Sequence, residues 1–153
     1  MAKRALENQS RVVRFFKSNI PVMADQPGEV SLYLLAVVVR IFEQSGGKLD
    51  RAAAREIEAA TAKVQAAVKS ANLIPAGPDF AARVRTIEDR AQPHILDEAL
   101  HALFEREDRK EGEIDMDADQ SALVFLMLWA ATEALDAAWR APRTPIWDAK
   151  GEA

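Results

Sequence analysis

The only two histidines of the chain, His94 and His101, lie in the same predicted helical segment as Glu98. Their spacing of i, i+4 and i+7 places the three side chains on one helical face, within roughly 60° of one another. The leucines of this segment lie on the opposite face. Two neutral imidazoles and a carboxylate suit zinc or ferrous iron and leave positions open for water. The pattern therefore predicts a candidate divalent-metal site made of His94, Glu98 and His101.

Other interpretations of this face stay open. Glu98 and His101 have the Glu-x-x-His spacing of di-iron bundles, but a di-iron site needs a second such pair, and the sequence has no further histidine. A polar stripe opposite leucines is also typical of a solvated helix face, with weak pairs between neighbouring turns. A pH-sensitive contact is a third possibility. If the face is solvated, the chain needs no cofactor.

A second candidate group lies near the end of the last predicted helix. Glu133 follows Trp129 by one turn in a segment that begins strongly apolar, and a half-buried carboxylate there could take part in acid–base chemistry. The alternative is that burial fades along the helix, so that Glu133 reaches solvent. Asp136 and Arg140 would then form an i, i+4 ion pair.

Charge is distributed unevenly along the chain. Residues 105–119 hold eight carboxylates against three basic side chains, but with Gly112 as the turn glycine they fail the EF-hand pattern, because Arg109 and Ala118 fall on ligand positions. We expect a solvated loop with Asp117 or Asp119 capping the next helix. Residues 1–17, by contrast, carry a net charge of +4, from Lys3, Arg4, Arg11, Arg14 and Lys17 against Glu7.

A basic first helix permits contact with an acidic partner or with nucleic acid. The segment 50–73 has no internal turn that would make a helix-turn-helix, and residues suited to phosphate contacts are sparse. A DNA-associated regulator is therefore an alternative function, with nucleic acid not the expected partner. A solvated face, or a contact with the acidic loop, explains the same charges.

Composition sets the fold class. The chain has 153 residues, of which 49 % are apolar and 29 % charged, with a net charge of −4 and no cysteine. This length is typical of one domain, and the missing thiols exclude disulfides and Cys nucleophiles. No apolar run reaches the roughly 20 residues that cross a bilayer, so we expect a cytoplasmic protein without membrane contact. Abundant alanine and the absence of alternating strands predict an all-α fold.

We predict a single-domain bundle of about six helices over residues 1–140, followed by an extended, proline-broken tail over 141–153. The predicted helices cover 3–19, 27–44, 50–71, 79–90, 93–109 and 117–140. Two of them, about 28–44 and 119–140, are apolar nearly all round and should form the buried centre. Gly46 and Gly47 suit a helix end, and Pro93 suits a helix start.

One pattern occurs twice. Phe42-Glu43 is followed by Gly47-Lys-Leu-Asp50 and a helix, and Phe104-Glu105 is followed by Gly112-Glu-Ile-Asp115 and a helix. The pair resembles the tandem helical domains of tellurite-resistance proteins, whose turns follow the pattern Asp-Gly-x-Ile-Asp. The resemblance covers two stretches of about ten residues. The Asp before Gly is replaced by Gly46 and Glu111, so the family's metal-binding acids do not carry over.

The helix predicted over 50–71 has a narrow apolar stripe, Ile57, Val64 and Val68, with alanines between. Such a stripe packs inside a bundle, or it forms a seam between two subunits. The leading functional hypothesis is a non-enzymatic, regulatory helical protein that acts through protein–protein contacts, as a homodimer. This stripe or the surface of the first helix would mediate the self-association. The alternatives are a metal-binding protein or metal-dependent enzyme using His94, Glu98 and His101, and the DNA-associated regulator.

Overall fold

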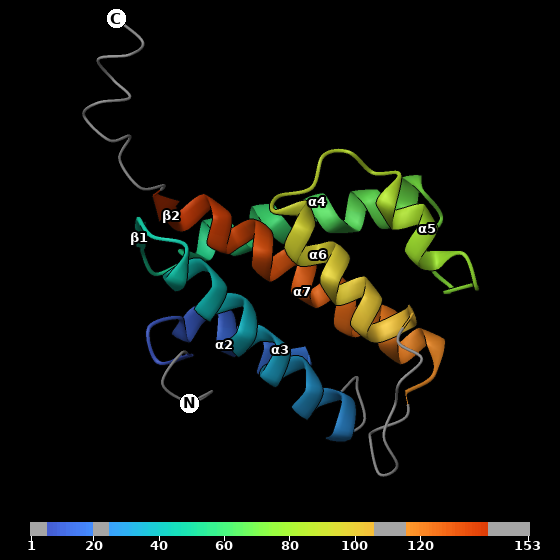
Figure 1. Ribbon diagram of the computed structural model, residues 1–153, viewed down its shortest axis with the longest axis horizontal. Helices are drawn as coiled ribbons and strands as arrows, with labels where there is room; N and C mark the ends of the chain where they lie inside the picture. Colours follow the sequence, from blue (N-terminus) through green and yellow to red (C-terminus); the bar gives the residue numbers. More distant parts are fainter. Residues whose placement is uncertain (1–5, 20–24, 106–115, 141–153) are drawn as a thin grey trace, which may run out of the picture.

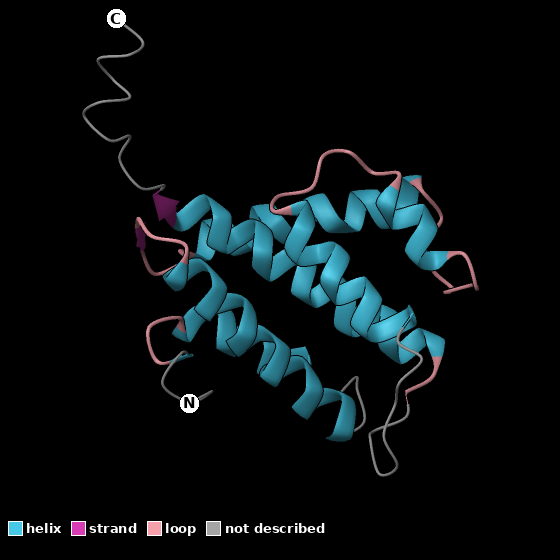
Figure 2. Cartoon of the chain, in the orientation of Figure 1, coloured by secondary structure: helices cyan, strands magenta, loops and turns pink. Residues whose placement is uncertain are grey.

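The computed structural model describes residues 6–19, 25–105 and 116–140, which form an all-α bundle (Figures 1 and 2). The helices are α2 (Ser10–Asn19), α3 (Asp25–Gln44), α4 (Ala54–Ser70), α5 (Phe80–Arg85), α6 (Pro93–Leu100) and α7 (Ala118–Ala138). A π-helical turn, η2 (His101–Glu105), continues α6, and two-residue strands β1 (Lys48–Leu49) and β2 (Trp139–Arg140) pair. The predicted tail, 141–153, lies outside the described residues.

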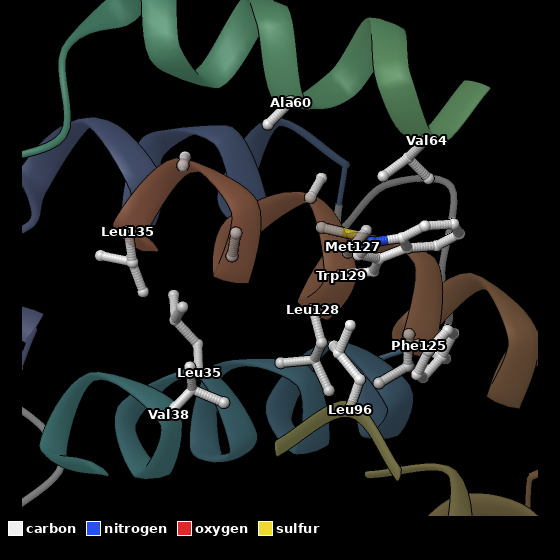
Figure 3. Packing of buried hydrophobic residues seen from close by; sticks show 14 of the residues in the cluster. Leu35, Val38, Ala60, Val64, Leu96, Phe125, Met127, Leu128, Trp129 and Leu135 are labelled. Carbon is white, nitrogen blue, oxygen red and sulfur yellow. The ribbon is translucent and has the colours of Figure 1, made fainter. Parts of the chain in front are cut away.

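Helix α7 forms the centre of the bundle. It packs most extensively against α4 on one side and α3 on the other, and Figure 3 shows its side chains between Val64 of α4 and Leu35 of α3. Trp129 and Leu135 are fully buried, as the all-round apolar sequence predicts. By length and composition alone α7 could cross a membrane, but 72 % of its apolar window is buried inside the bundle, as in a core helix.

Helix α3 is buried on one side only. Leu35, Val38, Val39 and Phe42 lie in the core. On the opposite face Tyr33 is 63 % exposed, and Val37 and Ile41 are each 38 % exposed. The expectation that neighbours surround this helix is wrong for that face, since its main described contacts, α7 and α2, lie elsewhere around it.

The predicted first helix is interrupted. Residues 7–9 leave helical geometry, and α2 begins at Ser10, with the Gln9 carbonyl accepting the first helical hydrogen bond from the Val13 N–H. The buried Gln9 side chain explains the break. Its amide nitrogen donates to the Asp50 carbonyl at 3.0 Å, and its amide oxygen accepts from the Ala52 N–H at 3.0 Å. A continuous helix over 3–19 is therefore wrong at this point.

Asp50 does not cap α4, which begins four residues later. The Glu56 carboxylate instead accepts the Ala53 N–H at 2.8 Å. Asp50 pairs with Arg140 at 2.8 Å, next to the antiparallel ladder of β1 and β2. This ladder was not predicted, and because of it α7 ends at Ala138 rather than at Arg140.

Several helix ends agree with the sequence. Gly46 and Gly47 have φ of 82° and 67° after α3, which glycine adopts without strain. Pro93 begins α6, and the Asp117 carboxylate accepts the Gln120 N–H at 2.8 Å at the start of α7. The helix predicted over 79–90 is shorter, because α5 ends at Arg85. In the helix predicted over 93–109, α6 changes to a π-turn at His101, which continues to Glu105. Residues 106–115, with most of the second copy of the repeated pattern, lie outside the described part of the chain.

Candidate functional site

Glu133 lies at the centre of a polar cluster that three protein donors form around its carboxylate. One carboxylate oxygen accepts from the Lys63 ammonium at 2.9 Å. The other accepts from the Trp129 indole N–H at 3.0 Å and from the Ala91 N–H at 2.8 Å. Only 11 % of the Glu133 side chain is exposed. The expectation that Glu133 emerges into solvent is therefore wrong.

This cluster joins three segments that are far apart in the sequence. Lys63 comes from α4, Glu133 from α7 and Ala91 from the loop between α5 and α6. In the same loop the Gln92 amide donates to the Asp136 carboxylate at 2.9 Å. Asp136 is thus bound to the loop, while Arg140 pairs with Asp50, which replaces the i, i+4 pair expected from the sequence.

The geometry favours a clamp over a catalytic group. Both oxygens of Glu133 already accept hydrogen bonds from the protein, and a general base needs a free oxygen within reach of a substrate proton. Three donors around one poorly exposed carboxylate are instead the usual way to bury a charge without leaving it unpaired. The cluster fixes the 86–92 loop against α4 and α7.

Lys63 makes the clamp sensitive to high pH. Burial lowers the Lys63 pKa, but hydrogen bonds and charge attraction from Glu133 and Asp89 outweigh burial, so the pKa lies above its ordinary value of 10.5. A raised lysine pKa stabilises the fold fully below the unfolded-state pKa, and this stabilisation is lost as the pH rises through the folded-state pKa.

We therefore expect Lys63→Met to lower the melting temperature at pH 7 to 9 and to matter progressively less above pH 10.5. Melting curves of the wild type and of this variant across that range measure the effect. Lys69→Met, at an exposed position on the same helix, is the control and should melt with the wild type throughout. A wild type–Lys63→Met difference that stays constant through pH 11 would refute the linkage.

The candidate metal face is solvated. His94, Glu98 and His101 are all exposed, and within the described ranges no three His, Asp or Glu side chains converge closely enough to hold a metal ion. The Nδ1 atom of His101 lies 3.7 Å from the Oε1 atom of Glu105. The Glu105 carboxylate accepts two hydrogen bonds from the Arg85 guanidinium, at 2.6 and 2.7 Å. The hydrogen bonds from Arg85 lower the Glu105 pKa, although desolvation opposes them.

Zinc binding by this face is tested directly with a double variant. Because exposed polar side chains contribute little, His94→Ala with His101→Ala should shift the melting temperature by no more than about 2 °C, the equivalent of roughly 0.5 kcal/mol. Added zinc should leave the wild-type and variant curves alike. A zinc-dependent rise of several degrees in the wild type, absent from the double variant, would instead establish the metal site.

An apolar groove lies between α2 and α4, and α7 forms the floor of the smaller of its two hollows. It consists of two hollows of about 360 and 270 Å³ that adjoin at Phe15. Its apolar lining includes Phe15 of α2, Ile57, Val64 and Val68 of α4, and Leu126 and Met127 of α7. We call this surface the α2–α4 groove.

The three residues predicted as an interface stripe lie along this groove. Val64 is only 5 % exposed and belongs to the core against α7, whereas Ile57 and Val68 are half-buried. Arg11 and Arg14 of α2 line the larger hollow, of about 360 Å³, and Glu58 of α4 lies across from them. The stripe was visible in the sequence, but the opposite wall was not, because α2 reaches α4 only through the tertiary fold.

Comparison with known protein families, with characterised proteins and with solved structures finds no match for this chain.

Proposed function

We propose that this chain is a non-enzymatic helical protein that acts through protein–protein contacts at the α2–α4 groove. The observation that carries the proposal is the apolar lining shared by three helices and left open to solvent. Apolar surface that a chain does not cover itself, rimmed by polar side chains, is typical of sites that bind a partner. Ile57 and Val68, half-buried on one wall, keep apolar surface for that contact.

The polar chemistry of the described residues supports the same proposal. Glu133, the best-buried carboxylate of the candidate cluster, has its oxygens occupied by protein donors. The histidine face lies in solvent, away from the groove lining. Glu133 and Lys63 line a hollow of about 400 Å³, but both Glu133 oxygens already accept hydrogen bonds from the protein, so this hollow presents no free carboxylate oxygen to a substrate.

The proposal is tested by placing a photo-crosslinking amino acid at Gln65, an exposed position in the groove lining. Ala66, the next residue, is also exposed but lies about 100° further round the helix, so it is a matched control. In the cells that make the protein we expect a discrete adduct from position 65 and none from position 66. The crosslinked protein is then purified, and Val68→Gln should weaken its binding to the chain. Equal adducts from both positions, or none from position 65, would overturn the proposal.

Self-association is a second candidate, and the exposed stripe of Tyr33, Val37 and Ile41 on α3 favours it. The stripe is symmetric about Val37, so two antiparallel copies of α3 would place Tyr33 of each chain opposite Ile41 of the other. Three side chains bury less area than the roughly 800 Å² per partner of a stable interface, so we expect a weak dimer. Sedimentation equilibrium should show it only at high concentration, and Val37→Glu should abolish it. A monomer at every concentration would exclude both this contact and the dimer predicted from the α4 stripe.

A further inference from the structure

We infer that the occupant of the α2–α4 groove is an amphipathic helix of a partner protein, with an apolar face and acidic side chains along one edge. This inference rests on the proposed function and specifies the partner's chemistry. It follows from the length of the groove, the composition of its lining and the charge on its rim.

The dimensions of the groove suit a helix. The residues of α4 that line it run from Ala54 to Val68, a rise of about 21 Å or four helical turns. Both walls are helices and α7 is the floor of the smaller hollow, so a helix laid between the walls makes the usual helix-in-groove contact. Ala54 and Thr61 on the α4 wall are small, which allows the close axial approach of packed helices.

The apolar lining determines the apolar face of the partner. Phe15, Val68 and Leu126 surround the smaller hollow, of about 270 Å³, whose lining is almost wholly hydrocarbon. Side chains at i, i+3 or i+4, and i+7 of a docked helix would point into this lining. Leucine or methionine at those positions would replace water against apolar surface.

The rim determines the charge of the partner. Arg11 and Arg14 are exposed and line the larger hollow, and neither makes an ion pair with a described residue. Helix α2 itself contains no carboxylate, so Glu58 supplies the one negative charge of the lining. A two-fold contact between two such grooves would enclose four arginines with two glutamates. Acidic side chains on a partner helix neutralise this rim, whereas a second copy of the chain leaves it positive.

The probe for this inference is a synthetic 16-residue helical peptide with leucines at i, i+3, i+4, i+7 and i+11 and glutamates at the flanking positions. Its counterpart carries lysines in place of the glutamates. We expect the acidic peptide to shift the backbone amide resonances of Phe15, Ile57 and Val68, with affinity that falls as salt is added. The basic peptide should bind at least about fivefold more weakly.

Matched variants of the full chain complete the test. Arg14→Glu should weaken binding of the acidic peptide by about fivefold or more, whereas Arg55→Glu, an exposed reversal on the opposite side of α4, should leave it unchanged. Equal binding of both peptides, shifts confined to residues outside the groove, or equal effects of the two variants would overturn the inference. If the Gln65 crosslink nevertheless forms, the proposed function stands and only the acidic helix is wrong.

Discussion

Replacing Glu133 with alanine is expected to lower the free energy of unfolding by about 3 kcal/mol, because three buried or half-buried donors lose one acceptor. The Trp129 indole N–H, the Ala91 N–H and the Lys63 ammonium all bond to this carboxylate at 2.8 to 3.0 Å. The truncation also leaves a void beside α7 where the carboxylate joins α4 to the 86–92 loop. Urea denaturation followed by far-ultraviolet circular dichroism measures the loss.

Two further variants separate the contribution of the Glu133 carboxylate from that of the exposed ion pair between Lys63 and Asp89. Glu133→Gln keeps an amide oxygen as an acceptor but removes the charge, so it should lose about half as much stability as the alanine variant. Asp89 is the outer partner of Lys63, and 93 % of the Asp89 side chain is exposed. Asp89→Asn should therefore change stability by less than about 0.5 kcal/mol. If Glu133→Ala were as stable as Asp89→Asn, the cluster would not be a structural clamp.

The second large effect is expected for Val64→Asp, which should lower the free energy of unfolding by about 4 kcal/mol, a large part of the stability of a typical domain. Val64 is 5 % exposed and packs from α4 against α7, so a carboxylate at this position would lose most of its hydration. Ala66→Asp introduces the same charge two residues later at an exposed position and should be nearly neutral. Denaturation curves of the two variants measure the difference.

The oligomeric state of Val64→Asp separates two uses of the α4 stripe. If the stripe served only as a seam between subunits, this variant would be a stable folded monomer. We expect instead that it is destabilised to the same extent at every protein concentration, because the packing of Val64 against α7 lies within one chain. A folded, fully stable variant would contradict the burial of Val64.

The features that depend on a few neighbouring residues could be predicted from the sequence. The all-round apolar run of α7 predicts the central helix, because such a helix is stable only when neighbours surround it. Gly46, Pro93 and Asp117 mark helix ends because their backbone or side-chain chemistry acts within one turn. The exposed histidine face likewise follows from the leucines opposite it.

What only the tertiary structure decides are contacts across many residues of sequence. Gln9 breaks the first helix because its amide bonds the backbone of a loop 41 and 43 residues away. Glu133 accepts hydrogen bonds from Lys63, which is 70 residues away in the sequence, and from Ala91, which is 42 residues away. The α2–α4 groove exists because three helices dock at a distance that leaves apolar surface between them. Periodicity specifies which face of a helix is apolar, but which neighbour covers that face, and how completely, depends on the packing of the whole bundle.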